Sequence, residues 1–224
     1  MKSSIVIKSS VFYQLTKQEN KMTKLTFLFF MLAILSFSLA ANTQQQPGEN
    51  IQKDNYYPSV MFETSMGNLI IELNRKKAPS TVNNFLSYVK RGEFNNTLFH
   101  RVIPGYIIQG GGYDPEYQER KASRTIINES GNGLKNDMYS IAMAREEDPH
   151  SARRQFFFNM KDNNNLDPGK NWGYTVFGSV IEGTDVLDKM ALVETEYKAL
   201  IRFQDAPKKH VLLIAATVLP EPKY

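Results

Sequence analysis

Arg101 lies in the segment FHRVIPGYIIQGGG, residues 99–112, where most of its neighbours are apolar. A guanidinium keeps its proton in proteins and is almost never fully buried without a partner. Arg101 is therefore either paired with a carboxylate or directed at a ligand. The chemistry that such a residue offers is hydrogen-bond donation from a permanent positive charge.

Other kinds of catalytic site find little support in the sequence. The three histidines, His100, His150 and His210, are too scattered to form a zinc motif, and the chain has no cysteine. No G-x-S-x-G segment is present, so an exported hydrolase would lack a recognisable pair of nucleophile and base. The glycines of residues 110–112 lack the Lys-Ser/Thr pair of a phosphate loop and favour a turn or bulge. We therefore expect neither a metal nor another cofactor.

The N-terminal residues indicate export. Residues 24–40, KLTFLFFMLAILSFSLA, combine a lysine, an apolar stretch and a small-residue end, which is the pattern of a secretory signal peptide. The apolar part is shorter than the roughly 20 residues of a membrane-spanning helix. Met22 directly precedes this segment, so residues 1–21 are a candidate for an untranslated upstream stretch. We predict a signal region over residues 1–40 and a periplasmic product; the alternative is secretion, or anchoring by an uncleaved signal.

The net charge belongs mainly to this N-terminal region. The chain has 27 Lys and Arg and 23 Asp and Glu, of which residues 1–40 hold five lysines and one glutamate. The mature chain would therefore carry 22 basic and 22 acidic residues. A neutral domain without a basic block does not support nucleic-acid binding. The remaining residues suffice for one domain, and a monomer is the default expectation.

The rest of the chain predicts many short strands and two helices. Residues 41–57 are polar and aperiodic, which favours a flexible lead-in. Two strands follow around a turn at residues 66–68. One helix is predicted from Pro79 to Gly92, and another over residues 184–193 with Thr184 as its candidate N-cap. Further strands are indicated by the apolar runs TLFHRVI, YIIQ, MYSIAMA, QFFFNM, YTVFGSVI and HVLLIAATVLP.

This order of elements indicates the fold class. Six or more strands, two helices and no alternating βα units point to a mainly β domain, either an antiparallel barrel or a sandwich with helical caps. The spacing does not decide between the two. The polar loop KDNNNLDPGKNWG, residues 161–173, is long for a compact domain and is a candidate functional loop.

Several motifs, in their order along the chain, resemble the cyclophilin family of peptidyl-prolyl cis-trans isomerases. Residues 99–111 resemble its F-H-R-[IV]-I-P-G-F-M-x-Q-G-G signature, and MA, QFF and VFG at residues 143, 155 and 176 resemble its later landmarks. The forms NNTLFHRVIPG, IAMAR and GYTVFG are closest to bacterial periplasmic members. The resemblance implies an eight-stranded antiparallel closed β-barrel capped by two α-helices, over residues 58–221.

The resemblance also implies an activity and a site. The protein would accelerate rotation about Xaa-Pro bonds to assist folding, with proline-containing polypeptides and unfolded exported proteins as its partners. Arg101 would be the catalytic residue, and Gln109 would orient Arg101 and the substrate carbonyl. The residues that would form the proline pocket are Tyr106, Ile107, Phe157 and Leu166. The further substrate-binding positions are Ala144, Arg145, Gln155 and Tyr174.

Two neighbours of these positions are expected to be structural. Phe156 should point to the opposite face of its strand from Phe157, into the core. His100 is next to the arginine, but rotation about an amide needs no proton abstraction.

Departures from the family pattern leave alternatives open. Asn165 stands where cyclosporin-sensitive members carry a tryptophan, which puts strong cyclosporin binding in doubt. Arg153 and Arg154 precede the QFF motif, where a small residue is common. They form either a solvated basic loop or a site that prefers acidic residues beside the proline. The alternative function is a weakly catalytic, proline-peptide-binding chaperone or adhesin on the same fold, because Tyr106 and Arg154 alter the expected pocket.

Overall fold

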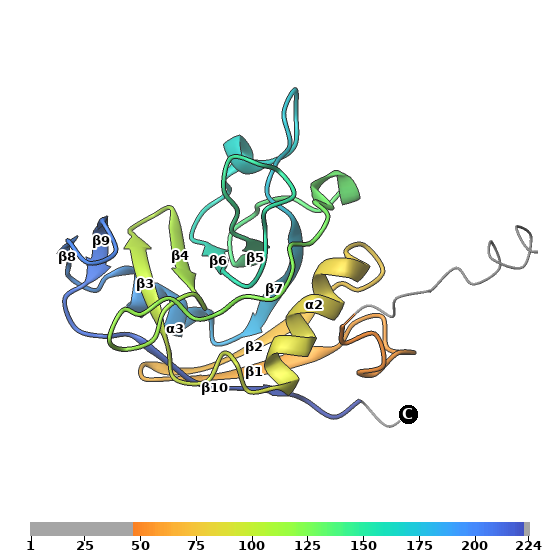
Figure 1. Ribbon diagram of the computed structural model, residues 1–224, viewed down its shortest axis with the longest axis horizontal. Helices are drawn as coiled ribbons and strands as arrows, with labels where there is room; N and C mark the ends of the chain where they lie inside the picture. The colour runs from red at the N-terminus through yellow and green to blue at the C-terminus, as the bar shows by residue number, and fades with distance from the viewer. Residues whose placement is uncertain (1–46, 222–224) are drawn as a thin grey trace, which may run out of the picture. The chain divides into compact units, whose positions relative to one another are not determined.

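Eight strands of the computed structural model hydrogen-bond side by side into a closed antiparallel barrel (Figure 1). The structure describes residues 47–221. Around the barrel the strands follow the order β1, β10, β3, β4, β6, β5, β7, β2. Their bounds are β1 Ser59–Thr64, β2 Gly67–Leu73, β3 Thr97–Ile103, β4 Ile107–Gly110, β5 Ser140–Met143, β6 Phe156–Asn159, β7 Val176–Glu182 and β10 Leu212–Val218. The predicted barrel, with its two helices, is confirmed.

The helix α2 (Pro79–Lys90) begins with a proline in its first turn, where a backbone N–H would have no partner within the helix. Its remaining free N–H groups are satisfied from another segment. The Glu129 carboxylate, beside the short 3₁₀ helix η1 (Ser130–Asn132), accepts hydrogen bonds from the Ser80 and Thr81 backbone N–H groups at 3.1 and 2.9 Å. A carboxylate at this end also complements the helix dipole. The helix ends before Gly92, as predicted.

The prediction for the second helix was wrong at its N-cap. In α3 (Thr184–Ala191) the N-cap is Gly183, and Thr184 is the first helical residue. Gly183 has φ 85°, and a Cβ there would lie 2.2 Å from the carbonyl oxygen of Asn68. Only glycine fits this close approach to β2, and local sequence preferences for N-caps do not report it.

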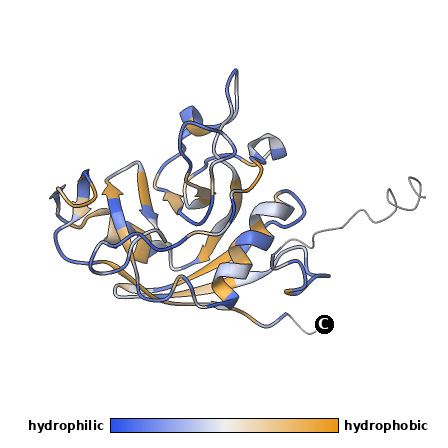
Figure 2. Cartoon of the chain, viewed as in Figure 1, coloured by the Kyte–Doolittle hydropathy of each residue, from blue (hydrophilic) through white to orange (hydrophobic). Residues whose placement is uncertain are grey.

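The barrel interior is filled by side chains from alternate positions of the strands and by one face of α2. Aromatic rings dominate it: Phe62 and Phe156 have ring centroids 5.5 Å apart, and Phe85 of α2 lies 5.7 Å from Phe156 edge to face. Phe156 is fully buried in this core, which confirms its predicted role. Figure 2 shows the apolar residues concentrated on the strands and on part of α2, with polar residues along the loops.

Two further strands lie outside the barrel, and the sequence did not predict them. β8 (Thr195–Lys198) and β9 (Phe203–Pro207) form a two-stranded antiparallel sheet. This sheet lies beside β3 in Figure 1, and β9 contacts β3. The pair has no glycine turn and only a short apolar pattern, so the hairpin signal in the sequence is weak.

The predicted flexible lead-in of residues 41–57 needs correction where it is described. Residues 47–57 form turns that are tied to the domain. The guanidinium of Arg75, which is itself buried, donates hydrogen bonds to the carbonyls of Ile51 and Asn55 at 2.6 and 2.9 Å. A charged donor that gathers several carbonyls holds this polar segment in place, although the segment lacks any periodic pattern.

The predicted signal region, residues 1–40, lies outside the described residues. Within residues 47–221, no helix is long and apolar enough to cross a membrane.

Candidate active site

One row of residues crosses five neighbouring strands of the barrel. Arg101 on β3 pairs with Gln109 on β4, and Gln109 pairs with Phe157 on β6. Phe157 in turn pairs with Ala142 on β5, which pairs with Val176 on β7. Residues directly opposite on adjacent strands present their side chains on the same face. The row therefore places a guanidinium and an amide beside an apolar strip on the outer face of the barrel.

A β-bulge directs Arg101 to that outer face. On β3 and β4, Phe99 pairs with Gly110 and Arg101 pairs with Gln109, so two steps on β3 match one step on β4. Strict alternation would place Phe99 and Arg101 on the same face. The extra residue, His100, shifts the alternation, so Phe99 enters the core while Arg101 stays partly exposed. This is how a charged residue occupies an apolar run without being buried.

The glycines opposite the bulge have a packing role. Gly111 has φ 82°, and a Cβ there would lie 2.8 Å from Cε1 of Phe156. A left-handed backbone in contact with a core ring needs glycine. The interpretation of residues 110–112 as a turn or bulge holds only in part. Gly110 ends β4 opposite the bulge, Gly111 and Gly112 form a bend, and the bulged residue itself is His100 on β3.

His100 is fully buried between aromatic rings, 4.7 Å from Tyr113 and 5.4 Å from Phe203 between centroids. Burial lowers its pKa to about 3, and the Leu98 backbone and Gln155 side chain oppose this shift only in part. The imidazole is therefore neutral over the whole physiological pH range.

This depressed pKa predicts a loss of stability in mild acid. Above pH 6.5 both the folded and the unfolded states hold His100 neutral, whereas between pH 6.5 and 3 only the unfolded state takes up the proton. Between pH 6.5 and 5 this one residue should lower the free energy of unfolding by about 2 kcal/mol. Denaturant unfolding at both pH values measures this change. The free energy of unfolding should fall by this amount between pH 6.5 and 5 in the wild type, and this contribution to its pH dependence should be absent from His100→Asn. Equal slopes in the two proteins would contradict the assignment.

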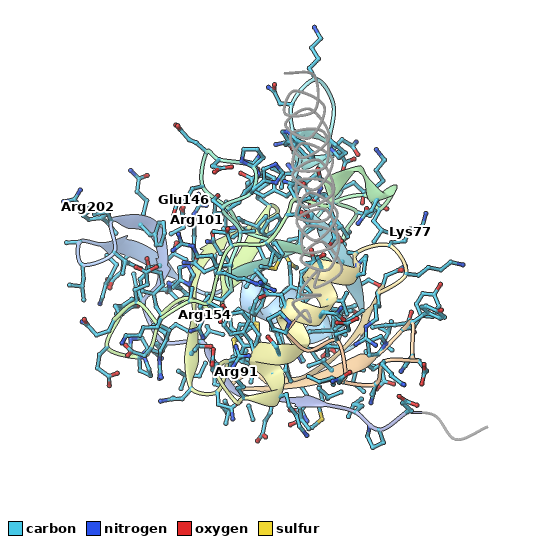
Figure 3. All side chains as sticks on the ribbon, turned by 45° about the vertical axis from the view of Figure 1, so that its right-hand side comes forward. Lys77, Arg91, Arg101, Glu146, Arg154 and Arg202 are labelled. Atoms are coloured by element: carbon cyan, nitrogen blue, oxygen red, sulfur yellow. The ribbon has the colours of Figure 1, made fainter. Side chains whose placement is uncertain are left out.

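A cavity of about 450 Å³ lies over the row. It brings together all ten residues that the sequence predicts for the site: Arg101, Tyr106, Ile107, Gln109, Ala144, Arg145, Gln155, Phe157, Leu166 and Tyr174. It is also lined by residues to which the sequence gave no role: Glu119, Ala122, Glu146, Ser151 and Phe203. Figure 3 shows Arg101, Glu146 and Arg154 on the side of the domain where β8 and β9 lie, away from Lys77.

The floor of the cavity is a hydrophobic cluster separate from the barrel core. Its buried members are the row residues Phe157, Ala142 and Val176, together with Ile107. Tyr174 packs edge to face on Phe157, with centroids 5.5 Å apart. Such an apolar surface suits a small non-polar ring.

Leu166 reaches this cluster from η2 (Asn164–Leu166), within the polar loop of residues 161–173. The neighbouring Asp167 carboxylate accepts hydrogen bonds from the backbone and side-chain N–H groups of Asn136 at 2.8 and 3.0 Å. Burial raises the pKa of Asp167, but hydrogen bonds from Asn136 and Lys135 outweigh it and lower the pKa below its usual value. The loop is thus anchored and places an apolar residue in the cavity.

The polar groups of the row are paired differently from the prediction. The family resemblance implies that Gln109 orients Arg101. In the structure the side-chain amide of Gln109 donates to the Gln155 carbonyl oxygen at 2.9 Å, and Nε of Arg101 lies 3.7 Å from Oδ2 of Asp205. Gln109 and Gln155 therefore support each other on the cavity wall, and the charge partner of Arg101 comes from β9.

Arg145 fastens the rim of the cavity. Its guanidinium donates to the carbonyls of Trp172 and Glu146, each at 2.8 Å, and lies 4.7 Å above the ring of Tyr174. These contacts bind two loops together beside the apolar floor. The structure places Arg145 at the cavity, but most of the guanidinium hydrogen bonds of Arg145 are to backbone carbonyls of the protein itself.

The position of Arg154 contradicts both interpretations of the pair Arg153 and Arg154. It is neither solvated nor free to attract acidic substrates, because it is buried. Its guanidinium donates to the carbonyls of Gly111, Lys121 and Glu93 at 2.8, 2.8 and 2.6 Å. Burial lowers the pKa of Arg154, and the neighbouring Tyr88 and Glu93 oppose this. Arg153, its exposed neighbour, also lines the cavity.

Sequence reasoning missed Phe203 and Asp205, which reach Arg101 from β9. The available signal was the alternation FQDAP after TEYK, too short to identify a strand pair. Their proximity to Arg101 depends on a contact across about a hundred residues of chain, and no local pattern encodes it.

Comparisons with known proteins find relatives in one family. Residues 59–218 match the family model described as cyclophilin type peptidyl-prolyl cis-trans isomerase/CLD. The chain is 47% identical over 165 residues to the peptidyl-prolyl cis-trans isomerase cyp18 of Streptomyces antibioticus, an alignment that covers 72% of this chain and 98% of the relative. It is 45% identical over 163 residues to the peptidyl-prolyl cis-trans isomerase B of Escherichia coli, covering 71% and 98%.

A solved structure shares the fold. The cyclophilin type isomerase of Cryptosporidium parvum, crystallised in the presence of the dipeptide Ala-Pro, superposes with a TM-score of 0.62 at 25% sequence identity. The match covers 73% of this chain and 99% of that one.

Proposed function

Since this chain belongs to the cyclophilin-type peptidyl-prolyl cis-trans isomerases, we propose that it catalyses rotation about Xaa-Pro bonds in exported proteins and assists their folding in the periplasm. Its isomerase activity is that of the family. The observation that carries the proposed site is the convergence of all ten predicted residues on one cavity with an apolar floor and a guanidinium at its wall.

Arg101 supplies the hydrogen-bond donor that the reaction needs. Resonance in the peptide bond sets a rotation barrier of about 18–20 kcal/mol. In the twisted transition state the prolyl nitrogen regains a lone pair, which accepts a hydrogen bond from a guanidinium N–H of Arg101. The planar ground state offers no such acceptor, so this interaction stabilises the transition state selectively. The step breaks no covalent bond and moves no proton between groups.

The apolar floor adds a second effect. The planar amide is more polar than the twisted amide, so water stabilises the ground state more. Seating the proline ring on Phe157, Ile107 and Leu166 removes that solvation and holds the bond in position. One hydrogen bond to a charged group contributes about 1.5–3 kcal/mol, so the floor and the pose must supply the rest of the rate enhancement.

The rim bears on inhibitor binding. Asn165 lies on η2, and its side-chain amide is 3.4 Å from the Tyr106 hydroxyl. A polar amide in that place offers no aromatic surface, so we propose that cyclosporin binds weakly. Lys161 lies 5.7 Å above the Tyr106 ring and makes this part of the rim polar.

Export is proposed from residues 24–40, whose pattern is that of a signal peptide. The test is expression of the full chain in a Gram-negative host, followed by release of the periplasmic fraction and mass measurement. We expect a soluble product that begins near Ala41. A full-mass product in the membrane fraction would support the anchored alternative and contradict the soluble one.

The folding role needs a protein substrate. An exported protein whose slow refolding phase is limited by proline isomerisation should refold faster with the mature chain, and the gain should vanish with Arg101→Ala. If both proteins leave the slow phase unchanged while suppressing aggregation, the chaperone alternative holds instead.

A further inference from the structure

The two-stranded sheet outside the barrel brings a carboxylate and an aromatic ring to Arg101. Oδ2 of Asp205 lies 3.7 Å from Nε of Arg101, and Cζ of Arg101 lies 5.9 Å from the centroid of the Phe203 ring. Both partners lie on β9, two residues apart, so alternation along the strand turns them to the same face. Phe203 is also part of the cavity wall.

The contact with Asp205 leaves most of the guanidinium free. Arginine has five N–H donors, and the carboxylate approaches the edge at Nε. At 3.7 Å the two groups attract by charge without a direct hydrogen bond. Their side chains are 32% and 35% exposed. Ion pairs with this exposure contribute little to the free energy of unfolding. A contribution to stability therefore does not explain why Asp205 lies beside Arg101.

Orientation of the Arg101 side chain does explain the contact. Arg101 has a long side chain with many rotamers, and its N–H must reach the prolyl nitrogen at the moment the bond is twisted. Gln109, the expected orienting residue, pairs with Gln155. A donor whose direction is fixed in advance stabilises the transition state more than one that must be ordered during the reaction.

We propose that Asp205 is a positioning residue for Arg101, with the Phe203 ring limiting the guanidinium on a second side. The carboxylate attracts the Nε edge and so turns the terminal amino groups toward the substrate. The inference rests on the proposed role of Arg101 in isomerisation and adds the residue that directs it. Asp205 itself touches no reacting atom.

A merely structural role would look different. Asp205 could hold β9 against β3, in which case its loss would loosen the sheet and lower the melting temperature. A positioning role instead lowers kcat with little change in KM or melting temperature. It also acts only through Arg101, so its effect disappears when that side chain is absent.

The experiment uses Asp205→Asn, which keeps the shape and removes the charge, in a coupled assay of an Ala-Pro-Phe peptide. We expect kcat to fall about 3- to 10-fold with KM within about twofold of the wild type, since misdirecting a catalytic group reduces the rate of the chemical step. In an Arg101→Ala background the same substitution should change nothing further. Asp205→Glu, which restores the charge, should recover part of the loss.

The matched control is Asp185→Asn, which removes an exposed carboxylate that pairs with Lys189 on α3. It should behave as the wild type. An unchanged kcat in Asp205→Asn, or an equal loss with and without Arg101, would overturn the proposal. If Arg101→Ala itself isomerises as fast as the wild type, the catalytic role of Arg101 fails, and that outcome is distinguishable from the failure of Asp205 alone.

Discussion

Replacing Arg101 with alanine is expected to lower kcat/KM for an Ala-Pro-Phe peptide by about 10- to 100-fold, the equivalent of one hydrogen bond to a charged group. The loss should appear mainly in kcat, because the bond to the prolyl nitrogen exists only in the twisted state. The apolar floor remains, so residual catalysis above the uncatalysed rate should survive. The measurement is the cis-to-trans rate, with circular dichroism to check that each protein is folded.

Two further variants sharpen this test. Arg101→Lys keeps the charge but loses the planar fork, and we expect it to recover only part of the activity. Arg91→Ala is the matched control, because Arg91 forms an exposed ion pair with Glu93 that lies outside the cavity. The wild type and Arg101→Ala could instead isomerise the peptide equally slowly and still bind proline peptides. That result would favour the alternative function, a weakly catalytic protein that binds proline peptides.

Replacing Arg154 with alanine should destabilise the fold by about 3–5 kcal/mol, because the buried guanidinium donates several hydrogen bonds and each hydrogen bond from a charged group contributes about 1.5–3 kcal/mol. The guanidinium donates hydrogen bonds to the carbonyls of Gly111, Lys121 and Glu93, which come from three separate segments. Cζ of Arg154 also lies 5.3 Å from the centroid of the Tyr88 ring. Without it, the buried carbonyl of Gly111 and the two partly buried hydrogen bonds to Lys121 and Glu93 lose their donor at once.

The adjacent Arg153 gives a matched control for this prediction. It is exposed, so Arg153→Ala should change the free energy of unfolding by less than about 0.5 kcal/mol. Guanidinium chloride unfolding of both variants measures the contrast. Similar stabilities for Arg153→Ala and Arg154→Ala would show that the three carbonyl contacts do not support the fold. Arg154→Lys should recover little, since an ammonium does not reproduce the geometry of the fork.

Much of the fold was predictable because its signals are local. The run TLFHRVI became β3 with the predicted bounds, and the helix from Pro79 ended before Gly92. Apolar alternation and Pro or Gly boundaries depend only on residues close together in the chain, so they can be recognised in the sequence alone. The errors came where a distant segment decided the structure. Thr184 lost its capping role to Gly183, which approaches β2, and the polar lead-in was fixed by Arg75.

The residues predicted for the site all line one cavity, but the contacts that several of them make could not be predicted. By itself the sequence determined the family signature, the apolar pocket residues and the presence of one arginine in an apolar run. Only the tertiary structure decided that a bulge at His100 turns Arg101 outward, that Asp205 faces it and that Arg154 is buried. Strand register and contacts between distant segments depend on the closure of the whole sheet, and no window of neighbouring residues contains that information.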